Sequence, residues 1–176
     1  MSYCRFCANL PADNPHVIYH NTEYGFPVKD DRILFAALLW EIMQAGLNWG
    51  TILRKRPYFQ AAFADYDIAR IAQFDETKIL ALMNDAQIIR HRRKIEAVIF
   101  NAQTVLRLQE EYGSFYAWIE TQKNQNFDQL LKTFKKHFHF VGKEILREFL
   151  LSTGFLPDAH DENCPVYQRI KSFQAA

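Results

Sequence analysis

The feature that most constrains the fold is a helical spacing of apolar residues that recurs from about residue 30 onward. In the first such segment Leu34, Ala37 and Leu38 fall on one helix face, behind a possible cap at Asp30 or Asp31. No segment alternates apolar and polar residues over the length of a strand. The sequence therefore predicts an all-α fold. Helices are expected near residues 31–45, 57–63, 75–83, 92–111, 115–119, 127–134 and 142–152.

Composition excludes several classes of protein. Hydrophobic residues make up 49% of the 176 residues and charged residues 23%, which suffices for a core and excludes a disordered chain. A net charge of +1 excludes a uniformly basic coat. We find neither a secretion signal nor an apolar stretch long enough for a membrane span, so we expect a cytoplasmic protein without membrane association.

The two ends of the chain, residues 1–29 and 154–176, lack clear periodicity, and we expect them to be irregular. They hold all three cysteines and several histidines: Cys4, Cys7, His16, His20, His160 and Cys164. Thiolates and imidazoles gathered on poorly packed segments fit a tetrahedral zinc ion that joins them. The alternative is a set of unconnected thiols and surface histidines, because the two halves lie far apart in sequence.

One carboxylate occupies an unusual position. On the first predicted helix Glu41 shares a face with Leu34, Leu38 and Ala45, so it points toward the apolar side. A buried charge must have a strong partner or a function, because burial of an unpaired charge is costly. Spacing alone leaves a salt bridge and a functional carboxylate equally open.

Two basic turns each precede a predicted helix. Residues 90–94 carry four positive charges, and residues 132–139 form a second turn of similar design. Cations at a helix start oppose the helix dipole, and a bound DNA phosphate would reverse that penalty. A solvated charged face is the alternative. The phosphate contacts that we expect are Arg90, Arg92, Lys94 and Lys136.

Several stretches together resemble the 3-methyladenine DNA glycosylase I family of bacterial base-excision repair. The matching residues are Cys4 and the ranges 18–25, 44–49, 84–92, 94–95, 138–142 and 160–164, in the family's order across nearly the whole chain. The resemblance implies a helix-hairpin-helix DNA glycosylase-like helical bundle, a single domain over residues 1–176. It also implies a structural Zn²⁺ that joins the ends, with Cys4, His20, His160 and Cys164 as ligands.

The resemblance also implies roles for four residues. Glu41 looks like the catalytic pocket carboxylate that recognises the damaged base. Trp49 and Tyr24 resemble the rings that sandwich this base, and Tyr19 resembles a further part of the pocket wall. The expected activity is that of a monofunctional DNA N-glycosylase, which flips 3-methyladenine out of alkylated double-stranded DNA and removes it by hydrolysis. We expect it to act as a monomer.

The chain departs from the family pattern at several positions. Tyr24 stands where the family commonly has Trp, and His16 occupies a position that is often aromatic. Asn48 replaces the usual Ser, Gln87 replaces a Gly, and the segment within residues 116–130 is shorter. We expect these departures to change the affinity for the damaged base and the range of substrates more than the fold.

A second reading is a non-catalytic, zinc-stapled module that binds alkylated or distorted DNA. The combination of Glu41, Trp49 and Tyr24 favours the enzyme over this module. A zinc hydrolase is disfavoured, because four protein ligands leave no coordination position for water.

Overall fold

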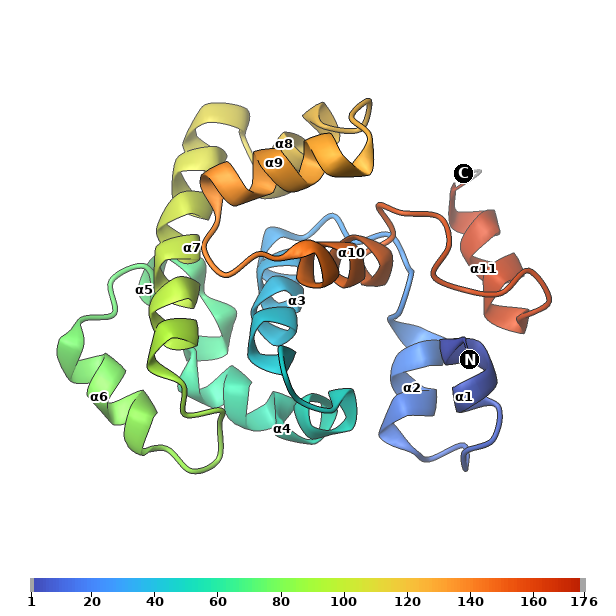
Figure 1. Cartoon of the computed structure of the whole chain (residues 1–176), viewed down its shortest axis with the longest axis horizontal. Helices are drawn as coiled ribbons and strands as arrows, with labels where there is room; N and C mark the ends of the chain where they lie inside the picture. The colour runs from blue at the N-terminus through green and yellow to red at the C-terminus, as the bar shows by residue number, and fades with distance from the viewer. Residues whose placement is uncertain (1, 175–176) are drawn as a thin grey trace. The chain divides into compact units, whose positions relative to one another are not determined.

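The computed structural model describes residues 2–174, and within this range all regular secondary structure is helical (Figure 1). This confirms the predicted all-α fold. The α-helices are α1 (Tyr3–Cys7), α2 (Pro15–Thr22), α3 (Asp31–Gln44), α4 (Trp49–Ala62), α5 (Ile68–Ile71), α6 (Glu76–Asn84), α7 (Arg92–Tyr112), α8 (Phe115–Thr121), α9 (Phe127–His137), α10 (Lys143–Ser152) and α11 (Pro165–Gln174). A short 3-10 helix, η1 (Ala64–Tyr66), precedes α5.

The chain forms two compact units. The terminal unit combines the described parts of residues 1–28 and 147–176, and the central unit comprises residues 29–146. Helix α10 begins in the central unit and ends in the terminal unit. The single domain predicted over residues 1–176 stays a prediction.

Helix α3 lies at the centre of the central unit. Asp30 caps its N-terminus by accepting a hydrogen bond from the backbone N–H of Ile33, and Gly46 follows its end with a φ of +80°. All of residues 34–43 are buried, and α4, α7 and α8 pack against the helix. Burial on every side explains why the sequence of α3 shows only a weak amphipathic pattern.

Helix α7 is the longest of the described helices and buries one apolar face. Ile95, Val98, Ala102 and Val105 are buried along one side, which packs against α3, α5, α6 and α8. Gly113 ends the helix in the left-handed conformation.

Helix α4 corrects the predicted helix over residues 57–63. It begins at Trp49, because the side chain of Asn48 caps it by accepting a 2.7 Å hydrogen bond from the backbone N–H of Gly50. Pro57 therefore lies inside the helix rather than at its start. A proline is common in the first turn of a helix, so Pro57 suggests a helix start that the structure does not have.

The two ends of the chain are less irregular than predicted. Ser2 caps α1, Asn14 caps α2, and α11 occupies much of the C-terminal segment. Helices α1 and α2 are short and show little apolar periodicity, so side-chain caps mark their starts more clearly than hydrophobic spacing does. Within the described residues no helix is both long and apolar enough to cross a membrane.

Candidate metal centre and base-recognition residues

Four side chains of the terminal unit converge on one point. Cys4 of α1, His20 of α2, and His160 and Cys164 before α11 place one ligand atom each within 4.8 Å of all the others. The Nε2 atom of His20 lies 3.2 Å from Nδ1 of His160 and 3.3 Å from Sγ of Cys4. The Nδ1 atom of His160 lies 3.5 Å from the Cys4 sulfur and 3.7 Å from the Cys164 sulfur.

These distances fit a tetrahedral metal ion. A metal at about 2.0 Å from nitrogen and about 2.3 Å from sulfur separates two nitrogens by about 3.3 Å and nitrogen from sulfur by about 3.5 Å. A set of two thiolates and two imidazoles favours a soft or borderline divalent ion. The structure thus confirms that the two ends of the chain meet at a cluster able to hold a metal.

The ligand atoms are oriented by further hydrogen bonds. Nδ1 of His20 lies 2.7 Å from Oδ1 of Asn21, and Nε2 of His160 lies 2.7 Å from the carbonyl oxygen of Tyr24. The backbone N–H of Asp161 donates to Sγ of Cys4 over 3.4 Å. Each imidazole therefore directs one nitrogen toward the cluster and fixes the other outside it, as in structural metal sites.

The environment of the cluster also shapes its protonation. Burial raises the pKa of the Cys4 thiol to about 11, with a further contribution from Cys164. Burial lowers the pKa of His160, which favours the neutral imidazole that binds metals. A divalent cation would favour the Cys4 thiolate and so offset the unfavourable effect of burial.

Cys7 and His16 are not part of the cluster. The buried Cys7 thiol donates a hydrogen bond to the carbonyl oxygen of His16 over 3.6 Å, and the hydroxyl of Tyr3 lies 3.0 Å from Nδ1 of His16. Of the two N-terminal cysteines, the geometry therefore selects Cys4. A cavity of about 460 Å³ is lined by residues that include Cys4, Cys7, His20 and Cys164.

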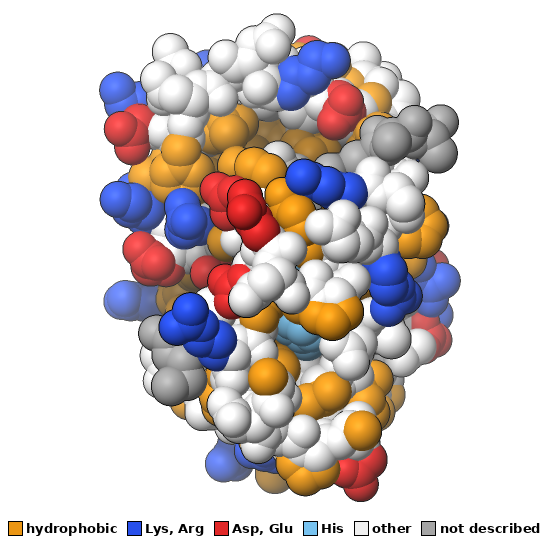
Figure 2. All heavy atoms as spheres, turned by 90° about the vertical axis from the view of Figure 1, so that its right-hand side faces the viewer, with side chains coloured by type: hydrophobic (Ala, Val, Ile, Leu, Met, Phe, Trp, Pro, Cys, Tyr) orange, Lys and Arg blue, Asp and Glu red, His pale blue; other side chains and the backbone are white. Residues whose placement is uncertain are grey.

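Figure 2 shows histidine atoms in a recess among mainly hydrophobic and uncharged side chains. Tyr19 and Tyr24 lie in the same unit and are both buried. Their ring centroids are 5.9 Å apart, and Tyr3 packs edge-on against Tyr24 at 5.1 Å. The hydroxyl of Tyr24 lies 3.4 Å from a carboxylate oxygen of Glu148. Tyr3 is a part of this aromatic cluster that sequence reasoning missed, because a single N-terminal tyrosine carries no pattern.

Glu41 and Trp49 belong to the central unit. The side chain of Glu41 lies in the last turns of α3 and is only 5% exposed, which confirms the predicted burial of this carboxylate. Trp49 is the first residue of α4 and is half-buried. The Gly46 turn and the Asn48 cap set the direction in which α4 leaves α3. The two pairs of predicted base contacts thus come from different units.

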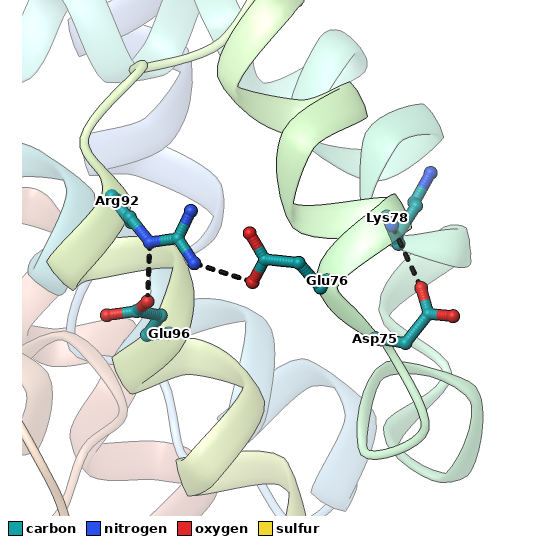
Figure 3. Close-up of polar contacts among 5 residues, drawn as sticks. All are labelled: Asp75, Glu76, Lys78, Arg92 and Glu96. Carbon is teal, nitrogen blue, oxygen red and sulfur yellow. Dashed lines mark hydrogen bonds and ion pairs between the residues drawn. The ribbon is translucent and has the colours of Figure 1, made fainter.

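Two of the four positive charges of the first basic turn, Arg92 and Lys94, make contacts within the protein. Arg92 forms ion pairs with Glu76 at 2.5 Å and with Glu96 at 2.8 Å (Figure 3). Asp75, beside this cluster, caps α6 by accepting a hydrogen bond from the backbone N–H of Lys78. These contacts tie the start of α7 to the start of α6.

Lys94 is buried rather than exposed. Its Nζ atom donates to the carbonyl oxygens of Met43 at 2.9 Å and Ala45 at 2.6 Å, at the end of α3. A cation at a helix C-terminus is favourable, and burial lowers the pKa of this amine. The structure therefore gives Lys94 a helix-capping contact that its sequence position does not reveal. Arg90 and Lys136 are exposed.

The second basic turn is held by a residue that the sequence did not single out. Asn101 of α7 donates to the carbonyl oxygen of His139 at 3.1 Å and accepts from its backbone N–H at 2.8 Å. The ring of His139 stacks on Phe100 with centroids 3.6 Å apart. A buried asparagine on a mainly apolar helix face was the available signal.

Comparisons with known proteins identify relatives across nearly the whole chain. The family model described as methyladenine glycosylase matches residues 10–131. DNA-3-methyladenine glycosylase 1 of Escherichia coli (strain K12) is 33% identical, over 92% of this chain and 96% of that protein. DNA-3-methyladenine glycosylase of Haemophilus influenzae is 31% identical, over 90% of this chain and 96% of that protein.

Solved structures agree with these relatives. A variant of 3-methyladenine DNA glycosylase I in complex with 3-methyladenine has a TM-score of 0.85 and 31% identity, covering 95% of this chain and 98% of that chain. The 3-methyladenine DNA glycosylase I of Staphylococcus aureus has a TM-score of 0.84 and 31% identity, covering 94% and 98%. By fold and by sequence, the chain belongs to the 3-methyladenine DNA glycosylase I family.

Proposed function

We propose that this chain removes 3-methyladenine from alkylated double-stranded DNA, as the first step of base-excision repair. The observation that carries the proposal is the buried carboxylate of Glu41 in a chain that shares fold and sequence with 3-methyladenine DNA glycosylases. A carboxylate held away from water favours a cationic base over neutral adenine, because burial strengthens the interaction between opposite charges.

The proposed chemistry needs little from the protein beyond extraction and recognition of the base. A 3-methylated adenine is cationic, so its bond to the sugar is already weakened. Glu41 holds the flipped base, Trp49 and Tyr24 stack on its faces, and Tyr19 completes the contacts. Water then attacks the anomeric carbon, the electron pair of the glycosidic bond passes to the base, and an abasic site remains. No lysine Schiff base takes part.

We further propose Zn²⁺ as the ion for the cluster in the terminal unit. Support comes from a donor set of two cysteines and two histidines at tetrahedral spacing. When bound, this ion would supply a cross-link between the two ends of the chain, because four protein ligands complete its coordination. Cys4, His20, His160 and Cys164 would hold it.

DNA binding is proposed to use the two basic turns in a helix-hairpin-helix arrangement. Arg90 and Lys136 are exposed and can reach phosphates directly. Arg92 can bind a phosphate oxygen once it releases its ion pair with Glu76. Lys94 instead anchors the turn to the end of α3 through its bond to the Ala45 carbonyl. The chain is expected to bind as a monomer.

Incubation of the purified protein with methylated genomic DNA, followed by chromatography of the released bases, tests the proposal. We expect free 3-methyladenine in the supernatant and unbroken strands with abasic sites. DNA binding without release of any base would support the non-catalytic module instead. Strand cleavage by the protein alone would contradict the monofunctional mechanism.

A further inference from the structure

The cluster in the terminal unit is connected to a proposed base contact through one histidine. His160 directs Nδ1 toward the other donor atoms and places Nε2 at 2.7 Å from the carbonyl oxygen of Tyr24. Coordination of a metal through Nδ1 would leave the imidazole proton on Nε2. That proton is then available for donation to the Tyr24 carbonyl, which accepts only.

The backbone beside Tyr24 packs closely against the segment that carries His160. Gly25 has a φ of +80°, and a Cβ atom at this position would lie 2.7 Å from the Cβ of Ala159 and 3.1 Å from Cδ2 of His160. The Gly25 N–H also donates to the carbonyl oxygen of Ser152 at 2.9 Å. The segment that carries the Tyr24 ring is thus pressed against the segment that carries the histidine.

The Tyr24 ring itself rests on the same histidine. Its centroid lies 5.5 Å from that of the His160 imidazole, in an edge-on arrangement. Tyr3, which packs against Tyr24, in turn meets the edge of His20 at 5.7 Å. Movement of the His160 ring would therefore disturb both the backbone and the ring of Tyr24.

We propose that His160 is a positioning residue for base recognition: through its Nε2–H bond to the Tyr24 carbonyl, metal occupancy sets the place of the Tyr24 ring. The inference rests on the proposed function, because it takes Tyr24 as a ring that contacts the base. It assigns to the metal cluster a second effect besides cross-linking, namely preorganisation of a base-stacking side chain.

The test compares two variants that keep four metal donors. His160→Cys and His20→Cys both give a site of three cysteines and one histidine, but only His160→Cys removes the hydrogen bond to Tyr24. Zinc content and thermal stability would be measured first. The affinity for free 3-methyladenine would then be measured by tryptophan fluorescence.

We expect both variants to retain zinc, with base affinity about tenfold weaker in His160→Cys and clearly less weakened in His20→Cys. Equal losses in two zinc-loaded variants would overturn the positioning role alone. A wild-type protein that binds no 3-methyladenine would instead overturn the proposed function.

A second measurement keeps the proposal falsifiable if His160→Cys does not fold. In zinc-loaded wild-type protein labelled with ¹⁵N-histidine, we expect a slowly exchanging Nε2–H signal from His160 that persists in His20→Cys. Removal of zinc with a chelator should abolish this signal and shift the amide resonance of Gly25. Coordination of zinc through Nε2 of His160, or a Gly25 amide resonance that does not shift when zinc is removed, would overturn the proposal.

Discussion

The two units stabilise their proposed base contacts in different ways. In the central unit α3 is buried along residues 34–43, and large side chains such as Phe59 and Phe115 are fully enclosed. The terminal unit also buries apolar side chains, such as Phe149 and Leu150, but its C-terminal cluster consists of Cys164, Val166 and Ile170 with a few partly buried neighbours. Glu41 is therefore held by helix packing, whereas Tyr24 is held by ring contacts with Tyr3 and Tyr19 and by polar contacts beside the four metal donors.

The largest expected effect tests this difference in the terminal unit. Cys164→Ser removes a metal donor, and we expect it to lower the free energy of unfolding by on the order of 5 kcal/mol in zinc-loaded protein. Cys7→Ser, whose hydroxyl can still donate to the His16 carbonyl, should cost only about 1 kcal/mol. Thermal unfolding with and without a chelator measures both values.

The two variants should also respond differently to the chelator. Wild-type protein and Cys7→Ser should lose stability when zinc is removed, whereas Cys164→Ser should change little. The metal does not stabilise the terminal unit if the two substitutions lower the free energy of unfolding equally. The same conclusion follows if the chelator leaves the stability of the wild-type protein unchanged.

In the central unit the corresponding test is Lys94→Met. The substitution keeps an unbranched apolar stem but leaves the carbonyls of Met43 and Ala45 without their donor, so we expect a loss of about 1–3 kcal/mol. Lys135→Met, at an exposed position, serves as the control and should change stability by less than about 0.5 kcal/mol. Chemical denaturation gives both numbers.

The same variant decides between two roles for Lys94. If Lys94 supports α3, its replacement lowers stability but leaves the salt dependence of DNA binding unchanged. Unchanged stability with a flatter salt dependence would make it a phosphate contact instead.

The smallest expected effect concerns which unit contacts phosphates. Replacing Arg90 and Lys136 together with Ala should reduce the slope of log affinity against log salt by about 2, since each phosphate contact contributes about 0.9. Lys171→Ala in the terminal unit should leave the slope unchanged. Binding to a short duplex at several salt concentrations measures the slopes. A slope that depends on Lys171 and not on Arg90 and Lys136 would assign DNA contact to the other unit.

Much of the central unit was predictable because its helices carry strong local signals. Asp30 and Asp75 cap helices, and Gly113 ends one in the left-handed conformation, so residues of types that favour helix ends lie at these helix ends. The start of α4 was not predicted, because Pro57 suggested a boundary while the weaker capping signal at Asn48 was overlooked.

The site was only partly predictable for a related reason. Residue types and the family resemblance suffice to assemble Cys4, His20, His160 and Cys164, which the structure brings together. Local residue spacing does not indicate which residues far apart in the sequence form hydrogen bonds. The contacts of Lys94 with the end of α3 and of His160 with Tyr24 are therefore visible only in the structure. A basic residue next to exposed arginines looks the same in sequence whether it faces DNA or the protein interior.

The most direct test of the central claim is the rate at which Glu41→Gln releases 3-methyladenine from methylated DNA. This substitution keeps shape and hydrogen-bonding capacity but removes the charge that favours a cation. Trp49→Ala should also slow release, because it removes base stacking worth about 1–3 kcal/mol. Glu110→Gln, an exposed change on α7, provides the matched control. We predict that Glu41→Gln slows release on the order of 10²-fold while Glu110→Gln has no effect. Release at the wild-type rate by both Glu41→Gln and Trp49→Ala would contradict the account and move the active site elsewhere.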